Sequence, residues 1–207
     1  FVMSLQPSGG VTLTRGRYEK DDADQPGRSR WDLTLVDCSL QYERFPYAIH
    51  NVCGNLVLED RRWDFHELRG EHGGSQIYCN GTWLPLFADQ PGGNLTLNFG
   101  CRDVPLNDSL PNAVGKLNPG AEKFWTSISP RGTVDKLDIT FQFNSVTRAS
   151  HINLVAEKKA TQQNLQGRGI TVRPSWFPLE LQDCTGRIRY QDGQFRLESI
   201  AARHGHS

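Results

Sequence analysis

The feature of this sequence that most restricts its fold is a repeated alternation of apolar and polar residues. Residues 134–144 read VDKLDITFQFN, and every second position from 137 onward is apolar: Leu137, Ile139, Phe141 and Phe143. Residues 94–101 read NLTLNFGC, and their alternate positions hold Leu95, Leu97, Phe99 and Cys101. Because successive side chains of a β-strand point to opposite faces, this spacing predicts strands with one apolar and one polar face.

The alternation recurs along most of the chain. In residues 75–83 it is carried by Ile77, Cys79 and Trp83. In residues 30–35 it is carried by Trp31, Leu33 and Leu35. The apolar phase then shifts by one residue at Val36, which predicts a β-bulge. Turn sequences such as DQPG and QDGQ separate the segments, so the sequence predicts a mainly β fold, a curved antiparallel β-meander sheet with one wet face.

One segment, residues 104–132, breaks this pattern and has the composition of helices. Asn107 or Asp108 can cap a first short helix. Asn118, followed by Pro119, can cap a second one. We interpret the segment as a helical plug packed against the sheet rather than as a lid over an active site. The predicted organisation is one or more β-meander units in 1–103, a helical insertion in 104–132 and a second, truncated β-meander unit in 133–207.

The charge balance argues against one class of partner. The chain has 23 basic and 23 acidic residues, and therefore no formal net charge. Proteins that bind nucleic acid carry a clear basic excess, so we expect no nucleic-acid partner. No run of about 18 apolar residues is present, so the segment itself is expected to hold no transmembrane helix.

A second constraint is an internal repeat. Residues 45–75 align without a gap to residues 177–207. Equivalent residues of the two copies are therefore 132 positions apart in the chain (177 minus 45), and we call this separation the repeat offset. Chance at average residue usage gives about two identities over such a length. Seven pairs are identical: Phe45/Phe177, Pro46/Pro178, Gly54/Gly186, Asp60/Asp192, His72/His204, Gly73/Gly205 and Ser75/Ser207. Repeats of this length bury their apolar surface by stacking on neighbouring units.

Each copy of the repeat is predicted to form a meander. A strand follows Gly54 or Gly186, and a hairpin turn at Asp60 or Asp192 leads into the next strand. The first copy continues into the alternating segment 76–83, whereas the second copy ends where that strand is due. We therefore expect the chain to be a fragment of a longer protein whose sequence continues with another alternating strand.

The stretch from Phe45 to Trp83 resembles the AsmA-like repeat of bacterial envelope proteins. It contains glycine followed by alternating hydrophobic residues and then the pattern L-x-G-x-x-G-x-S, here LRGEHGGS at residues 68–75. Residues 104–135 resemble an insertion found in large AsmA-like proteins of planctomycete-type bacteria. The resemblance covers residues 11–207.

The resemblance implies a long, taco-shaped β sheet with an apolar concave face, similar in architecture to eukaryotic bridge-like lipid transfer proteins. It implies a cell-envelope protein that extends into the periplasm and is anchored in the inner membrane by a segment outside this sequence. The implied function is non-enzymatic binding or conduction of phospholipid between the inner and outer membranes. No cofactor is implied.

A lipid groove needs an apolar sheet face, because acyl chains are bound by burial of their CH₂ groups and not by hydrogen bonds. Strands of about seven residues would span roughly 23 Å, enough to curl around an acyl chain. The same alternation also occurs in a closed sandwich core, so an open groove and a closed core both remain possible. The expected lipid-facing residues are Ile77, Cys79, Trp83, Leu95, Leu97, Phe99, Leu137, Ile139, Phe141 and Phe143.

Two other functions are weaker hypotheses. A β-rich adhesion or carbohydrate-binding module of a secreted or surface protein would stack sugars on exposed tryptophans: Trp31, Trp63, Trp83 or Trp176. A hydrolase is disfavoured because no nucleophile elbow, phosphate-binding loop or dinucleotide fingerprint occurs. Asp135 and Asp138 are predicted on opposite faces of one strand, where they cannot act as an acid and base pair.

Neither histidine nor cysteine spacing predicts a metal site. His72 and His204 occupy equivalent repeat positions, which favours a structural role in a turn. The five cysteines include no closely spaced pair, and each lies in an alternating apolar segment. We interpret them as small buried hydrophobic residues.

Overall fold

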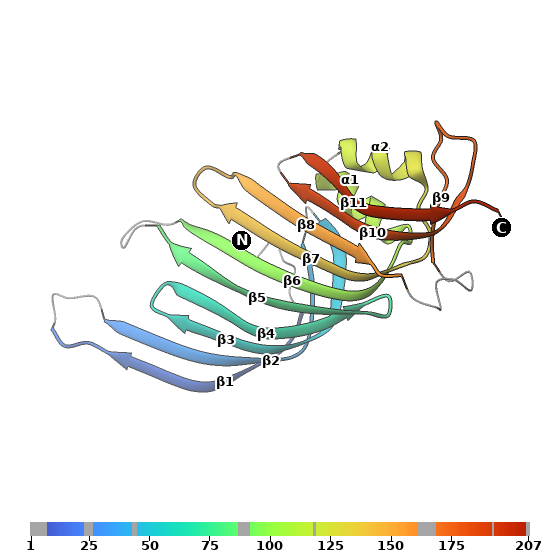
Figure 1. Cartoon of the computed structure of the whole chain (residues 1–207). Coiled ribbons are helices and arrows are strands. Elements are labelled where there is room, and N and C mark those ends of the chain that lie inside the picture. The colour runs from blue at the N-terminus through green and yellow to red at the C-terminus, as the bar shows by residue number, and fades with distance from the viewer. Residues whose placement is uncertain are drawn as a thin grey trace.

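The structure is a computed structural model that describes residues 8–22, 27–42, 45–86, 92–117, 119–160, 169–191 and 193–205. Within these residues the chain forms eleven strands and two helices (Figure 1). The first strands are β1 (Ser8–Glu19), β2 (Arg28–Tyr42), β3 (Phe45–Glu59), β4 (Arg62–His72), β5 (Ser75–Pro85) and β6 (Gly93–Pro105). The remaining elements are α1 (Ser109–Leu117), α2 (Pro119–Ile128), β7 (Thr133–Asn144), β8 (Ser150–Lys158), β9 (Ile170–Val172), β10 (Leu181–Gln191) and β11 (Gln194–Arg203).

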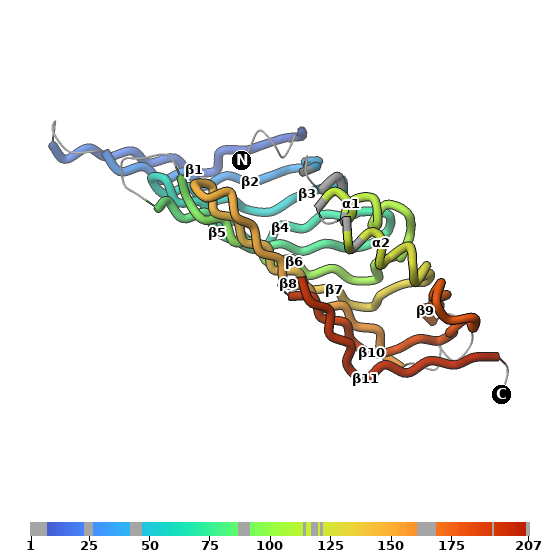
Figure 2. The backbone as a smooth tube through the Cα atoms, turned by 90° about the horizontal axis from the view of Figure 1, so that it is seen from above, coloured from blue at the N-terminus to red at the C-terminus, as the bar shows by residue number. Residues whose placement is uncertain are grey.

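All the strands belong to one open sheet. Its order is β1-β2-β3-β4-β5-β6-β7-β8-β10-β11, every pair is antiparallel, and the short β9 pairs with β10 beside this path. Figures 1 and 2 show the sheet curving and twisting from β1 to β11. The predicted fold class is confirmed: a mainly β chain forms a curved antiparallel meander interrupted by two short helices.

The strands are longer than the alternation alone indicates. The sequence predicted strands of about seven residues, whereas β2 and β3 each contain 15 residues. Bulges explain the difference, because they shift the apolar phase without ending the strand. The predicted bulge near Val36 is present: Leu35 pairs with Gly54, but Cys38 pairs with Val52, and Asp37 has a positive φ of 48°.

The register gathers the apolar side chains on one face. Residues directly opposite each other in antiparallel strands point to the same side of the sheet. Leu33 pairs with Leu56, and Leu56 pairs with Phe65. Further along, Leu97 pairs with Phe141. Alternating residues of neighbouring strands therefore form one apolar face across the sheet.

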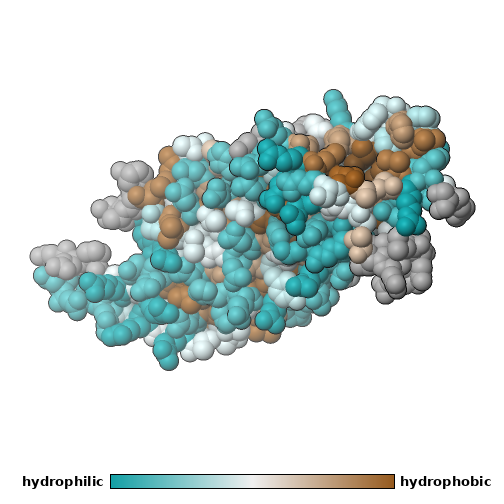
Figure 3. All heavy atoms as spheres, in the orientation of Figure 1, coloured by the Kyte–Doolittle hydropathy of each residue, from teal (hydrophilic) through white to brown (hydrophobic). Residues whose placement is uncertain are grey.

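The opposite face is polar. Figure 3 shows a mainly hydrophilic surface over β1 to β8 on the side that faces the viewer in Figure 1. Side-chain hydrogen bonds run between strands there: Thr140 Oγ1 donates to Asn98 Oδ1 (3.0 Å), and Asn144 Nδ2 donates to Asn94 Oδ1 (2.9 Å). This face is adapted to water.

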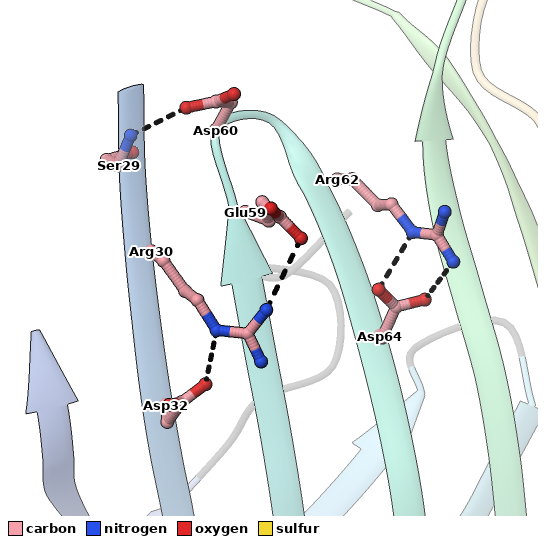
Figure 4. Close-up of polar contacts among 7 residues, drawn as sticks. All are labelled: Ser29, Arg30, Asp32, Glu59, Asp60, Arg62 and Asp64. Atoms are coloured by element: carbon pink, nitrogen blue, oxygen red, sulfur yellow. Dashed lines mark hydrogen bonds and ion pairs between the residues drawn. The ribbon is translucent and has the colours of Figure 1, made fainter. Parts of the chain in front are cut away.

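Ion pairs of the polar face cluster where β2, β3 and β4 meet (Figure 4). The Arg30 guanidinium lies 3.2 Å from Asp32 and 3.5 Å from Glu59. Arg62 contacts Asp64 on the same strand at 2.8 Å. Both arginine side chains are about half exposed, and ion pairs screened by water in this way add little to the stability of a fold. Their main role is to keep this face hydrated and to disfavour its burial.

The helical pair is an insertion between β6 and β7. The two ends of this insertion are joined by a hydrogen bond from the Leu106 amide to the Gly132 carbonyl oxygen (2.9 Å). Asn107 is the cap of α1, because its Oδ1 accepts from the Ser109 amide at 3.2 Å. Pro119 is the first residue of α2, as predicted, while Asn118 lies outside the described residues. No helix of the described part is long and apolar enough to cross a membrane.

One cluster of buried hydrophobic residues lies at one end of the strands. It consists of Ile77, Cys101, Val104, Val134 and Leu137, and Leu106 and Ile170 pack against it. The accessible surface of the chain is 13495 Å². A compact monomer of this length exposes about 9700 Å². The fold therefore buries less surface than a compact globular chain of this length.

Candidate functional site

The apolar face is the strongest candidate for a functional surface. We define it by side chains that successive register pairs place on one side of the sheet: Val11, Leu13, Trp31, Leu33, Leu56, Leu58, Trp63, Phe65, Ile77, Cys79, Trp83, Leu95, Leu97, Phe99, Cys101, Leu137, Ile139, Phe141, Phe143, Ile152, Leu154, Ile188, Tyr190, Phe195 and Leu197. It runs through all ten strands of the main path.

One end of the apolar face is covered. Figure 2 shows both helices on one side of the sheet, toward one end of the strands. Helix α1 contacts β3, and Phe124 of α2 stacks on Phe195 of β11 with ring centroids 5.1 Å apart. The helices therefore lie over the apolar face, between β3 and β11. Ile77 and Leu137, at 5% and 7% exposed, belong to the buried cluster beside the helical insertion.

The other part of the face is open. Six of the sequence-predicted residues remain half-buried there or at its boundary: Trp83, Leu97, Phe99, Ile139, Phe141 and Phe143. Cys79 and Leu95 lie on the same face but are buried by their neighbours, at 8% and 1% exposed. The structure thus brings all ten predicted residues onto one face and divides them between a covered core and an open surface.

At both edges of the sheet, apolar side chains of this face are exposed. On β1, Val11 and Leu13 are 59% and 54% exposed. On β11, Leu197 and Ile200 are 61% and 49% exposed. Single exposed apolar residues are ordinary on protein surfaces, whereas contiguous apolar patches mark binding surfaces.

Three of the four predicted tryptophans form a row across the open part. Trp31 pairs with Leu58, and Trp63 pairs with both Leu58 and Trp83. Glycines adjoin two of these rings: a Cβ on Gly16 would lie 2.6 Å from the Trp31 ring, and one on Gly93 would lie 2.5 Å from the Trp83 ring. These glycines leave room for the rings to lie against the sheet. Trp176, 65% exposed, lies outside the row, before β10.

The two copies of the repeat pair in the same way. For every pair of residues that face each other in β10 and β11, the equivalent residues of the first copy face each other in β3 and β4. For example, Ile188 pairs with Leu197, and their equivalents Leu56 and Phe65 also pair. His72 Nδ1 donates to the Ala48 carbonyl oxygen (2.6 Å), and at the equivalent positions His204 Nδ1 donates to the Glu180 carbonyl oxygen (2.8 Å). Both histidines thus bind backbone near a turn.

Backbone conformation is repeated as well. Gly54 and Gly186 have φ values of +142° and +128°. A Cβ on Gly54 would lie 2.8 Å from the Leu68 Cα, and one on Gly186 would lie 2.7 Å from the Ile200 Cδ1, so each glycine contacts the equivalent residue of the next strand. The positive φ and the close approach of the next strand both require glycine at these two positions, and neither can be seen in the sequence.

The copies diverge at their first residues. Phe45 and Pro46 belong to β3, although their side chains are not described, whereas Phe177 and Pro178 precede β10 in an exposed segment. Gly73 and Gly205 both have positive φ, as expected at a turn. Asp60 has a φ of 53° in the β3–β4 turn, and its equivalent, Asp192, lies outside the described residues.

One ion pair lies on the apolar side, and sequence reasoning missed it. Lys158 Nζ contacts Asp135 Oδ1 at 2.6 Å, and the Lys158 side chain is only 9% exposed. Asp138 instead pairs with Lys136 at 2.6 Å on the polar face. The two aspartates therefore lie on opposite faces, as predicted. No sequence signal distinguishes Asp135 from other strand carboxylates, because its partner comes from the next strand.

A shallow hollow of about 400 Å³ lies on the polar face around Gly100. Its wall includes Tyr78, Arg102 and the Lys136–Asp138 pair. Because that carboxylate and ammonium neutralise each other, the hollow offers no net charge to a ligand from this pair. No group of three or more metal-ligating side chains occurs in the part of the chain that the structure describes.

The cysteines are all unpaired and differ in exposure. Cys38, Cys79 and Cys101 are buried, as predicted, whereas Cys184 is only half-buried. Cys53 is exposed, so the prediction of burial is wrong for this residue. The reason is the irregular backbone around it: Asn51 and Gly54 both have positive φ, and Cys53 faces Arg69. Burial raises the pKa of Cys79 to about 12 and that of Cys101 to about 11.

These differences predict a pattern of thiol reactivity. At pH 8, iodoacetamide is expected to modify Cys53 on the order of 100-fold faster than Cys79 or Cys101, because only thiolates react and burial suppresses their formation. Peptide mass spectrometry after timed quenching measures the rates. In denaturant all five cysteines should react alike. Equal rates for Cys53 and Cys79 in the folded chain would contradict the difference in burial between them.

No protein-family model, curated protein or solved structure matches this chain.

Proposed function

We propose that the open part of the apolar face binds the acyl chains of phospholipids, and that the chain is a non-enzymatic segment of an AsmA-like envelope protein that moves lipid between membranes. The observation that carries the proposal is the in-register apolar face. It crosses ten strands, while the chain's own helices cover only one end of it. A closed core would leave no such surface.

The dimensions fit an acyl chain. Ten strands spaced about 4.8 Å apart make the face roughly 43 Å long across the strands. One acyl chain spans about half of a ~30 Å hydrocarbon layer, or roughly 15 Å. The face can therefore hold more than one lipid along its length, which suits conduction as well as storage.

The energetics also favour hydrocarbon. Each buried CH₂ contributes about 0.8 kcal/mol, so ten of them contribute roughly 8 kcal/mol before the cost of association. The aromatic residues of the open part, such as Trp83, Phe141 and Phe143, offer large apolar contact areas. Their only hydrogen-bonding group is the indole N–H of tryptophan. The polar face, with its ion pairs and amide hydrogen bonds, stays in water.

The location and partners follow from the resemblance of Phe45–Trp83 to AsmA-like repeats. On this proposal the chain lies in the periplasm, and parts of the parent protein outside this segment contact the inner and outer membranes. The ligand is a phospholipid or another molecule with an acyl chain. No cofactor takes part.

A second candidate function is carbohydrate binding, and the row of Trp31, Trp63 and Trp83 favours it. Sugar rings stack on exposed aromatic side chains, but they also need hydrogen-bonding groups beside them. The row is instead flanked by apolar partners, Leu58 and Leu95. We therefore rank the lipid proposal first.

The decisive experiment is native mass spectrometry of the chain purified without detergent. The expected result is a population of the protein carrying one or more phospholipids, identified after release. Titration with a fluorescent fatty acid should give saturable binding that phospholipid vesicles, but not soluble oligosaccharides, compete away. Absence of lipid adducts together with no saturable fatty-acid binding would refute the proposal, and competition by oligosaccharide would favour the alternative.

A further inference from the structure

The outer edge of β11 is equivalent to an edge that is paired elsewhere in the same sheet. The β10–β11 hairpin has the register of β3–β4, moved by the repeat offset. In the first copy the far side of β4 pairs with β5 from Trp63 to His72, with a bulge between Phe65 and Leu68. In the second copy the corresponding side of β11 ends the described sheet.

The duplication extends to the strand before each hairpin. In the first copy Cys38 pairs with Val52 and Leu40 with Ile49. In the second copy Ile170 pairs with Cys184 and Val172 with Leu181, and each of these positions is again displaced by the repeat offset. Strand β9 thus takes the place of the last part of β2. Since three successive strands follow one geometry, the position of a fourth can be inferred.

The exposed fractions show what a fourth strand would cover. Leu68 of β4 is 8% exposed, whereas its equivalent on β11, Ile200, is 49% exposed. Phe65 is half-buried, whereas its equivalent Leu197 is 61% exposed. The residues of β4 are less exposed because side chains of β5 lie next to them. Within the described residues, no strand lies on the corresponding side of β11.

We infer that the edge of β11 binds an extended peptide segment that has the chemistry of β5. This segment pairs antiparallel with β11, and its alternate side chains extend the apolar face. The register follows from the first copy, where Trp63 pairs with Trp83, Leu68 with Cys79 and His72 with Ser75. The bound segment therefore places a large aromatic residue opposite Phe195, a small apolar residue opposite Ile200 and a small polar residue opposite His204.

Physical chemistry supports strand addition at this edge. An edge strand presents unpaired backbone amide and carbonyl groups, which a further strand can bind, and pockets between alternate side chains give specificity. Apolar residues at Leu197 and Ile200 favour a partner with an apolar face over a polar one. The inference rests on strand register and on the exposure of the β11 edge, so it stands or falls independently of lipid binding.

The test uses the whole chain and a synthetic peptide with the sequence of residues 75–85, under reducing conditions and at millimolar peptide. Hydrogen–deuterium exchange is measured by mass spectrometry. We expect amide exchange in residues 194–203 to slow about fivefold, while residues 8–19 of β1, the other edge, stay unchanged. In a control peptide, each residue changes places with its neighbour, so that the composition is kept but the apolar residues move to the other face of the strand. This peptide should not slow amide exchange in residues 194–203.

Two variants of the protein sharpen the result. Leu197→Asp places a charge on the apolar side of the exposed edge strand and should abolish the slowing. Arg196→Ser changes the adjacent residue on the polar side and should preserve it. Slowing in β1 instead of β11, equal slowing by both peptides, or none with the residue 75–85 peptide would each overturn the inference.

Discussion

Replacing Phe141 with aspartate is expected to weaken fatty-acid binding at least tenfold, equivalent to about 1.4 kcal/mol, while the sheet stays folded. Phe141 is half-buried in the open part of the apolar face, between Leu97 and Ile152 of the neighbouring strands. A carboxylate there must either stay hydrated, which displaces the acyl chain, or lose water at a high cost. The titration with a fluorescent fatty acid measures the affinity.

The matched control for this variant is Gln142→Asp. Gln142 is the next residue of β7 and is exposed on the polar face, so the same charge should leave fatty-acid affinity unchanged. Circular dichroism and thermal melting report whether each variant is folded. Phe141→Ala, which removes the ring without adding charge, gives a second reading if the aspartate variant is unstable. Folded Phe141 variants with unchanged affinity would show that this face does not bind the acyl chain.

Gly54→Ala is expected to be the most destabilising of the small substitutions, by about 3–4 kcal/mol. The φ of +142° disfavours any L-residue, and the added Cβ would lie 2.8 Å from the Leu68 Cα and 2.9 Å from the Glu67 carbonyl oxygen. Strained backbone costs about 1–3 kcal/mol, and overpacking against backbone adds about 1–3 kcal/mol. Urea denaturation, followed by circular dichroism, gives the free energy of unfolding.

Substitutions at two other glycines distinguish the cost of backbone strain from the cost of overpacking. Gly74 has a φ of +87° but no atom within 4 Å of an added Cβ. Gly74→Ala should therefore cost only the strain, about 1 kcal/mol. Gly186→Ala repeats both the strain and the contact, but on the edge hairpin, which can move away. Its effect should be smaller than that of Gly54→Ala and confined to faster amide exchange in β10 and β11. Equal losses at Gly54 and Gly74 would show that the Leu68 contact is unimportant.

Alternation made much of the sheet predictable. Leu95, Leu97 and Phe99 occur at every second position, and so do Ile139, Phe141 and Phe143 on the neighbouring strand. A strand displays such residues on one face whatever its neighbours are, so the ten predicted residues share a face. Strand β1 is harder to predict: VTL at residues 11–13 alternates, but the arginines and glycines that follow weaken the pattern.

Bulges and cross-strand partners were harder to predict. Cys53 lies on the polar face because the backbone conformation at Asn51 and Gly54 shifts the phase, and such a shift is set by the adjacent strands. The Asp135–Lys158 pair joins residues 23 positions apart. Local sequence patterns carry no information on a contact that depends on the register of two strands.

The sequence by itself determined the antiparallel meander, the two-helix insertion and the composition of the two faces, because strand period, helix capping and turn residues are local properties. Only the tertiary structure decided which part of the face is closed: Ile77 and Leu137 are buried, whereas Phe141 and Phe143 stay partly accessible. Coverage depends on the curvature of the whole sheet and on contacts such as Phe124 with Phe195. Residues with the same alternation can therefore form a closed core at one end of a strand and an open surface at the other.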